Sequence, residues 1–202
     1  FILFNGSSGC MESFCATFVD QGDVVIVEGP SFPGTVETIL KYRGEIQEVS
    51  IDSEGASIDR IQSIVLESEN RGKRVKGLYV IPDFHNPVGV TMSLGRRREI
   101  ATFCLKKDIL IVEDSTYSGL YFKSPPPPSL YSINHGLGVL RMGTFSKTIA
   151  TGLRLGWMQG EESAIEAMCK TRADMGNAPF IQSAVAEFIR SGEFENHVRQ
   201  MR

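Results

Sequence analysis

The 202-residue sequence contains few of the residues that build metal sites or disulfide frameworks. It has three histidines and four cysteines. The cysteines are Cys10, Cys15, Cys104 and Cys169, and no two of them are spaced as in C-x-x-C. The sequence therefore indicates neither a zinc site nor a disulfide scaffold, and we expect no metal. Reduced thiols are typical of a cytoplasmic protein.

An excess of charge and long hydrophobic runs are also missing. The net charge is −3 and 22% of the residues are charged, so the sequence lacks the basic footprint of a nucleic-acid or anionic-membrane binder. No apolar run approaches the roughly 18 residues of a membrane span. The basic cluster of residues 96–98 with Lys106 and Lys107 alternates with Ile100, Phe103 and Cys104 at helical spacing, which predicts a solvated helix face. With 42% apolar residues, we expect a soluble, globular protein.

Apolar runs alternate with helical patterns along the whole chain. Strands are predicted at residues 1–5, 24–28, 45–51, 75–82, 109–114 and 138–142. Helices are predicted from the turn 6–9 to about residue 20, and at 33–42, 93–107, 164–172, 179–190 and 194–202. A further helix is predicted to begin at residue 57 and to end before residues 67–76, which are predicted to form a polar surface connection. Continuous apolar strands separated by helices predict an α/β fold, with a doubly wound, mostly parallel sheet flanked by helices.

The stretch Gly143-Thr-Phe-Ser-Lys-Thr-Ile-Ala-Thr-Gly-Leu-Arg-Leu-Gly-Trp157 presents one lysine in a short loop between two apolar runs. Lys147 is flanked by the hydroxyls of Thr144 and Ser146, and Arg154 follows it. An amine at a fixed place suits a bond to a carbonyl group, and a guanidinium matches phosphate oxygens. The alternative is an ordinary surface lysine on a Ser/Thr loop.

Small and polar residues also follow the other predicted strands. Gly6-Ser7-Ser8-Gly9 turns the first strand into a helix, and such a helix start binds anions. The dinucleotide fingerprint G-x-G-x-x-G is absent from this turn. Phe32 follows the second strand, and Asn86 lies in His-Asn-Pro-Val-Gly after the fourth. Each of these features alone also fits a plain turn or loop packing.

Asp114 ends the fifth predicted strand, and Tyr117 comes three residues later. An acidic residue there is either a cap for the next turn or a site residue. Ligands of parallel sheets collect beyond the carboxyl ends of the strands, which favours a site.

Taken together, these segments resemble the class I/II (fold type I) pyridoxal-phosphate-dependent aminotransferases, in the 2-aminoadipate/kynurenine aminotransferase-like branch. The resemblance covers nearly the whole chain and implies pyridoxal 5'-phosphate as cofactor, with a Schiff base on Lys147. It implies catalytic roles for Lys147, Asp114 and Tyr117. It also implies a set of cofactor-binding residues, namely Ser7, Ser8, Phe32, Asn86, Asp114, Tyr117, Thr144, Ser146, Lys147 and Arg154.

The roles implied within this set differ. The turn at Ser7 and Ser8 would hold the phosphate, and Phe32 would stack on the ring. Asn86 and Tyr117 would contact the ring oxygen, and Asp114 the ring nitrogen. Three positions depart from the family pattern: Ser8 replaces a frequent Gln, Phe32 a Tyr or Trp, and Val88 the Thr of HNPTG.

The implied reaction moves an amino group from an amino acid to a 2-oxo acid. We expect residues 1–190 to be a large domain truncated at its N-terminus, and 191–202 to begin the helix that leads into a small C-terminal domain. The family is dimeric and takes its substrate-carboxylate arginine and a phosphate-binding tyrosine from other segments, so this chain alone should be inactive. Two alternatives remain: a pyridoxal-phosphate lyase or aminocyclopropane-carboxylate synthase-like enzyme, and the effector-binding half of a MocR-type transcriptional regulator.

Overall fold

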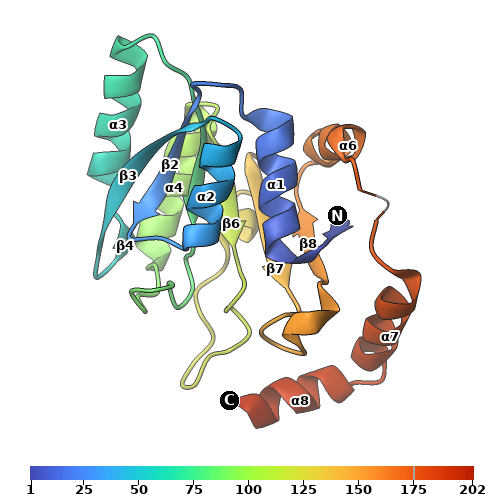
Figure 1. Ribbon diagram of the computed structural model, residues 1–202. Coiled ribbons are helices and arrows are strands. Elements are labelled where there is room, and N and C mark those ends of the chain that lie inside the picture. The colour runs from blue at the N-terminus through green and yellow to red at the C-terminus, as the bar shows by residue number, and fades with distance from the viewer. Residues whose placement is uncertain (175) are drawn as a thin grey trace.

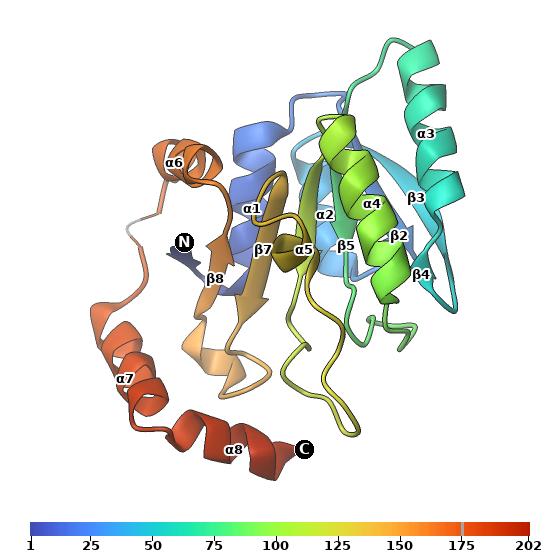
Figure 2. The same ribbon diagram turned by 180° about the vertical axis from the view of Figure 1, so that it is seen from behind.

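The computed structural model describes residues 1–174 and 176–202, and its centre is an eight-stranded sheet with helices on both faces (Figures 1 and 2). The strands are β1 (Ile2–Phe4), β2 (Val24–Gly29), β3 (Glu45–Asp52), β4 (Gly55–Ala56), β5 (Val75–Val80), β6 (Leu110–Asp114), β7 (Val139–Thr144) and β8 (Gly156–Gln159). The helices are α1 (Gly6–Phe18), α2 (Pro33–Lys41), α3 (Ile58–Asn70), α4 (Leu94–Lys106), α5 (Leu130–Ile133), α6 (Glu162–Thr171), α7 (Pro179–Arg190) and α8 (Glu193–Met201), with a 3₁₀ turn at Thr151–Leu153. The predicted α/β class is confirmed.

The strand order is β1-β8-β7-β6-β5-β2-β3-β4. The inner strands β3, β2, β5, β6 and β7 run parallel to one another, as predicted for a mostly parallel sheet, while the outer strands β4 and β8 pair antiparallel with β3 and β7. After β2 the chain moves outward to β3, then returns to place β5 on the other side of β2. The topology therefore switches between β2 and β5, where the following loops diverge and leave room for a ligand.

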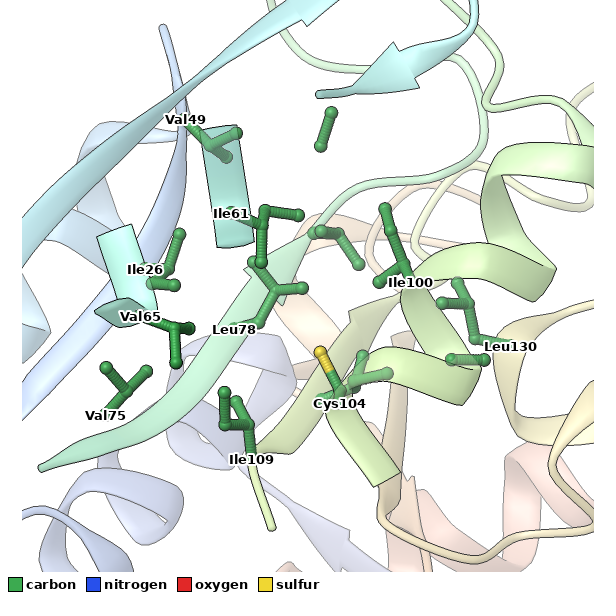
Figure 3. Packing of buried hydrophobic residues seen from close by; sticks show 14 of the residues in the cluster. Ile26, Val49, Ile61, Val65, Val75, Leu78, Ile100, Cys104, Ile109 and Leu130 are labelled. Atoms are coloured by element: carbon green, nitrogen blue, oxygen red, sulfur yellow. The ribbon is translucent and has the colours of Figure 1, made fainter. Parts of the chain in front are cut away.

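Side chains of the inner strands alternate between two hydrophobic cores, as the pleat of a strand requires. Ile26 and Leu78 pack with α3 and α4 on one face, in the cluster that Figure 3 shows. Val25 and Tyr79 point to the opposite face, which is covered by α1, α2 and α6. Both faces of the central strands are buried, which explains why they read as continuous apolar runs in the sequence.

Several sequence predictions need correction. Residues 1–5 do not form a buried strand, because β1 lies at the sheet edge and Phe1 is 84% exposed. The polar segment expected to begin at Glu67 still belongs to α3 up to Asn70, and Ser68 in its last turn is buried. The short antiparallel strands β4 and β8 and the single-turn helix α5 were not predicted.

The predicted solvated helix face at the basic cluster is wrong for two of its three arginines. Arg97 is fully buried, and only Arg98 is exposed. The side chain of Arg96 donates to the carbonyl oxygens of Gly55 and Ala56, which joins α4 to β4. Helical spacing shows which positions share a face, but it does not show that a loop will cover that face.

The last two helices extend away from the sheet (Figures 1 and 2). α8 nevertheless reaches the loops at the carboxyl edge, where the rings of Phe194 and Phe145 lie 6.1 Å apart between centroids. Arg202 donates to the Gly119 carbonyl oxygen from the end of the same helix. Across the described parts of the chain, every helix is too short or too polar to cross a membrane.

Candidate active site

A cleft of about 190 Å³ opens at the carboxyl edge of the sheet, beside the switch between β2 and β5. All ten residues predicted to bind a cofactor line it, although they come from six separate segments. They are Ser7, Ser8, Phe32, Asn86, Asp114, Tyr117, Thr144, Ser146, Lys147 and Arg154. The fold thus brings together side chains that lie up to 147 residues apart (154 − 7).

Asp114 ends β6 and is buried at 6% exposure. Its Oδ2 accepts a hydrogen bond from the Tyr79 hydroxyl at 2.7 Å, and its Oδ1 accepts from the Thr116 backbone N–H at 3.0 Å. Burial raises the pKa of Asp114, and these two hydrogen bonds oppose the rise. A carboxylate held this way favours a cationic partner on its open side.

The first turn of α1 and the guanidinium of Arg154 form the anion-binding end of the cleft. Arg154 Nη2 donates to the Asn5 carbonyl oxygen at 3.2 Å, directly before the helix. A Cβ built on Gly6 would lie 2.8 Å from that same nitrogen, so only glycine lets the guanidinium approach. Among the described residues, no side chain caps this helix start. Its free N–H groups, its dipole and the guanidinium together favour phosphate.

Lys147 projects from the loop that follows β7. Thr144, the last residue of β7, shapes this loop: its hydroxyl lies 3.2 Å from the Leu155 carbonyl oxygen and accepts from Ser146 N–H at 3.2 Å. The Lys147 ammonium is exposed and makes no ion pair with any residue of 1–174 or 176–202. The amine is therefore available to a ligand in the cleft.

Asn86 and Tyr117 meet on another side of the cleft, where Asn86 Nδ2 donates to the Tyr117 hydroxyl at 3.4 Å. Burial, and next the charge of Asp114, raise the pKa of Tyr117. Its phenol stays protonated at neutral pH and can donate to a ligand oxygen. Phe32 precedes α2 and is 38% exposed, so its ring is available for stacking.

Sequence reasoning missed four residues of this region. Ile81, Thr116 and Thr151 also line the cleft, and Tyr79 supports Asp114 from behind. The hydroxyl-rich segments around Asp114 and Lys147 could have suggested the two threonines. No sequence signal marks Tyr79, because an aromatic residue in a buried strand is usually core. No cluster of three or more metal-ligating side chains occurs in the described part of the chain.

The arrangement suits a flat ligand with three distinct ends. An anionic group fits the start of α1 beside Arg154, and a carbonyl group lies within the reach of a free amine. A ring atom that can carry positive charge fits against the buried carboxylate of Asp114.

The comparisons with known proteins agree with this geometry. Residues 1–202 match the family model described as aminotransferase class I and II. The aromatic-amino-acid aminotransferase 1 of Thermococcus litoralis is 30% identical over 96% of this chain and 47% of its own length. The uncharacterized HTH-type transcriptional regulator YisV of Bacillus subtilis is 32% identical over 100% of this chain and 41% of its own length.

Among solved structures, the kynurenine aminotransferase of Pyrococcus horikoshii, crystallised in complex with PMP, superposes with a TM-score of 0.93. It is 28% identical and covers 99% of this chain, while the chain covers 50% of it. The chain thus spans about half the length of the relatives it matches. Since the family model covers all 202 residues, the chain belongs to the class I and II aminotransferases.

Proposed function

We propose that this chain is the cofactor-binding part of a pyridoxal-phosphate-dependent aminotransferase, which moves an amino group from an amino acid to a 2-oxo acid. One observation carries the proposal. A free lysine amine, a buried carboxylate and a guanidinium at a helix start line the same cleft. Family membership and the PMP complex of the P. horikoshii relative support it.

The residues of the cleft fit pyridoxal 5'-phosphate. The space at Gly6, which a Cβ would fill, and the adjacent Arg154 guanidinium suit its phosphate. The buried Asp114 carboxylate suits a protonated ring nitrogen, and Asn86 and Tyr117 suit the ring oxygen. When bound, the cofactor supplies an aldehyde that takes up the amino group and a conjugated ring that spreads the charge left at Cα.

The protein side of the reaction follows from these positions. Lys147 would hold the aldehyde carbon of the cofactor, and its amine, when free, would take the Cα proton of the substrate and return it. The buried Asp114 carboxylate would hold a proton on the ring nitrogen by pairing with its positive charge. Tyr117 would donate its phenolic hydrogen to the ring oxygen, and Arg154 and Ser8 would fix the position of the phosphate.

The finer assignments rest on family membership and relatives. We propose substrates in the range of the aminoadipate, kynurenine and aromatic aminotransferases that the chain resembles. We further propose a homodimer that works in amino acid metabolism in the cytoplasm. Residues 1–190 would belong to the cofactor-binding large domain, and 191–202 would begin the connection to a small domain.

Chemical trapping tests the proposed covalent link. The full-length protein is loaded with pyridoxal 5'-phosphate, reduced with borohydride and digested, and the pyridoxyl adduct is mapped by mass spectrometry. We expect the adduct on Lys147, and Lys147→Ala should hold the cofactor only non-covalently. An adduct on Lys170 or another lysine would refute the assignment.

A second candidate is the effector-binding half of a transcriptional regulator. Three regulators, from Bacillus subtilis and Escherichia coli, match 97–100% of this chain at 29–32% identity, as well as the aminotransferases do. Such a protein would bind the same cofactor at Lys147 but would also bind DNA. Gel-shift assays of the full-length protein on its own upstream region, run beside transaminase assays, separate the two functions. A lyase would release ammonia or a cyclised product instead of a new amino acid.

A further inference from the structure

The largest fully buried side chain of the described residues is charged: Arg97 of α4 has 0% exposure. Removing a guanidinium from water costs several kcal/mol unless its donors find partners. An apolar side chain of similar size would fill this space without that cost. The hydrogen-bond partners of Arg97 show what this arginine holds in place.

Arg97 forms hydrogen bonds to both ends of the loop that contains Asn86. Its Nη2 donates to the Pro82 carbonyl oxygen at 3.0 Å, where the loop begins. Its Nε donates to the Met92 carbonyl oxygen at 3.0 Å, where the loop ends. Met92 N–H closes the same loop on the Pro82 carbonyl oxygen at 2.8 Å. The two ends of the Asn86 loop are thus held by one rigid side chain on a helix.

The same guanidinium reaches the connection that carries Tyr117. Nη1 lies 3.2 Å from the Pro127 carbonyl oxygen and 3.3 Å from that of Pro128. A second link runs through Asp83, which is 3% exposed and accepts from Arg97 Nη2 at 2.5 Å. The other Asp83 oxygen accepts a hydrogen bond from the hydroxyl of Ser118, the residue after Tyr117.

Asn86 and Tyr117 themselves make only a long contact of 3.4 Å. A hydrogen bond of this length contributes little, so the loops that carry these residues must set their separation. Neither Arg97, Asp83 nor Ser118 lines the cleft.

We propose that Arg97 is a positioning residue, which through Asp83 and Ser118 holds Asn86 and Tyr117 at the spacing needed to grip one ligand oxygen. The proposal rests on the proposed function, because that function makes this oxygen the ring oxygen of pyridoxal 5'-phosphate. Arg97 touches neither cofactor nor substrate. It acts by joining two loops that follow different strands.

Ser118→Ala in the full-length protein tests the link, because it removes one hydroxyl and leaves Arg97 in place. The main readout is the pH titration of the absorbance of the Lys147-bound cofactor, which reports hydrogen bonding to the ring oxygen. We expect its midpoint to move by about 0.5–1 pH unit, the effect of altering one hydrogen bond. Ser118→Thr keeps the hydroxyl and should restore the wild-type midpoint.

Ser129→Ala is the matched control, since this buried serine lies on the same connection. Among the described residues its hydroxyl bonds only to Ser132 of α5, accepting from the N–H at 3.1 Å and donating to the hydroxyl oxygen at 3.0 Å. It should lower thermal stability without moving the midpoint. Arg97→Met should move the midpoint further than Ser118→Ala, and if it does not fold, the serine variants still decide. Equal midpoints in wild type, Ser118→Ala and Ser129→Ala would overturn the positioning role. Wild-type protein without a Lys147-linked chromophore would refute the proposed function itself, and the positioning role with it.

Discussion

Asp114 shows how a single residue can favour binding at the expense of folding. Its carboxylate is buried and accepts hydrogen bonds from two neutral donors, the Tyr79 hydroxyl and the Thr116 N–H. No cationic side chain of the described residues pairs with it. Burial raises its pKa, which means that the charged form is disfavoured in the folded protein. A cationic ring nitrogen would remove that penalty, so the apoprotein and the loaded protein should respond differently to losing the charge.

We first predict that Asp114→Asn stabilises the apoprotein. The amide can accept from Thr116 N–H and donate to the Tyr79 hydroxyl oxygen, so both contacts survive. Because the folded-state pKa lies above the ordinary 3.8, the wild type loses stability as pH rises through that raised pKa. The variant should melt about 2–4 °C higher at neutral pH for each kcal/mol gained. The difference should shrink as pH falls toward the ordinary pKa, and a constant difference would contradict this account.

In the loaded enzyme the same substitution should be harmful. An amide supplies no charge to hold a proton on the ring nitrogen, so we expect turnover to fall by about 10²–10³-fold or more and cofactor affinity to weaken. Single-turnover kinetics with a saturating amino acid measure this directly. Unchanged turnover would show that the carboxylate serves only the turn at Thr116.

Tyr117→Phe should have a milder effect than Asp114→Asn. It removes one donor and leaves the Asn86 amide in place, so the loss should be roughly tenfold in turnover, the scale of one hydrogen bond. The absorbance titration of the bound cofactor should shift as well, because Tyr117 is proposed to touch the ring oxygen. A loss as large as that of Asp114→Asn would assign Tyr117 a proton-transfer role instead.

At the scale of elements, the start of α1 is open to the Arg154 guanidinium because residue 6 has no side chain. Gly6 has a φ of +74°, and a Cβ there would press on Arg154 Nη2 at 2.8 Å. Gly6→Ala should therefore displace the guanidinium and weaken binding of pyridoxal 5'-phosphate by roughly tenfold or more. Binding of pyridoxal, which has no phosphate, should change little.

Gly9→Ala is the control for that prediction. It lies in the same helix without a positive φ, and its Cβ would meet Phe4 Cβ at 3.4 Å, an ordinary contact. Equilibrium titration of both cofactor forms into the two variants gives the comparison. Equal losses for both forms in Gly6→Ala would mean that the substitution disturbs the helix rather than the phosphate site.

Helix α5 depends on a residue of the neighbouring strand. The Glu113 carboxylate accepts from the backbone N–H groups of Leu130 at 3.0 Å and Tyr131 at 2.9 Å, so a β6 side chain satisfies the first turn of the helix. Glu113→Ala would leave two buried donors without partners and should lower the free energy of unfolding by about 2–4 kcal/mol. Glu113→Gln should cost clearly less, as measured by urea denaturation. Because glutamine fills the same space, equal losses would exclude cavity formation and would show that a single acceptor oxygen cannot satisfy the two N–H groups.

The elements that sequence reasoning predicted and those that it missed differ in a physical way. Strands such as β2 and β5 are buried on both faces and give continuous apolar runs, and α7 matched its predicted bounds of Pro179–Arg190. β8 was missed because four residues give no periodicity, and its pairing with β1 joins segments about 155 residues apart in the chain. The buried role of Arg97 was missed for a similar reason, since its partners come from two distant loops.

The site was easier to anticipate than the support around it. The resemblance to the aminotransferase family predicted all ten residues that line the cleft, whereas each feature on its own also fitted a plain turn or loop packing. Tyr79 and Arg97 carry no such mark, because a buried aromatic residue and a helical arginine are ordinary in sequence. Their contribution depends on hydrogen bonds that only the folded chain forms.

At the scale of the whole molecule, the cleft has side chains that suit each end of the proposed cofactor but no further cationic side chain, among the described residues, for the carboxylate of a substrate. Lys147 and Arg154 are the only cationic side chains that line it within the described residues, and both are assigned to the cofactor. An amino acid substrate also needs a partner for its carboxylate, for which a bidentate arginine is the usual solution. The chain spans about half the length of its relatives. Large aromatic side chains are exposed on it, with Phe122 at 83% and Phe180 at 80%.

We therefore predict that the 202-residue chain, expressed alone, binds pyridoxal 5'-phosphate but does not transaminate. Borohydride reduction should still label Lys147, which would show that the cleft is formed. Mixing the loaded chain with a panel of amino acids should leave the absorbance of the bound cofactor unchanged, because no guanidinium orients the Cα proton toward Lys147. The full-length protein under the same conditions is the control and should convert the cofactor to its amine form. Conversion by the 202-residue chain at a comparable rate would show that the substrate is bound by residues described above, and would make Arg154 the first one to re-examine.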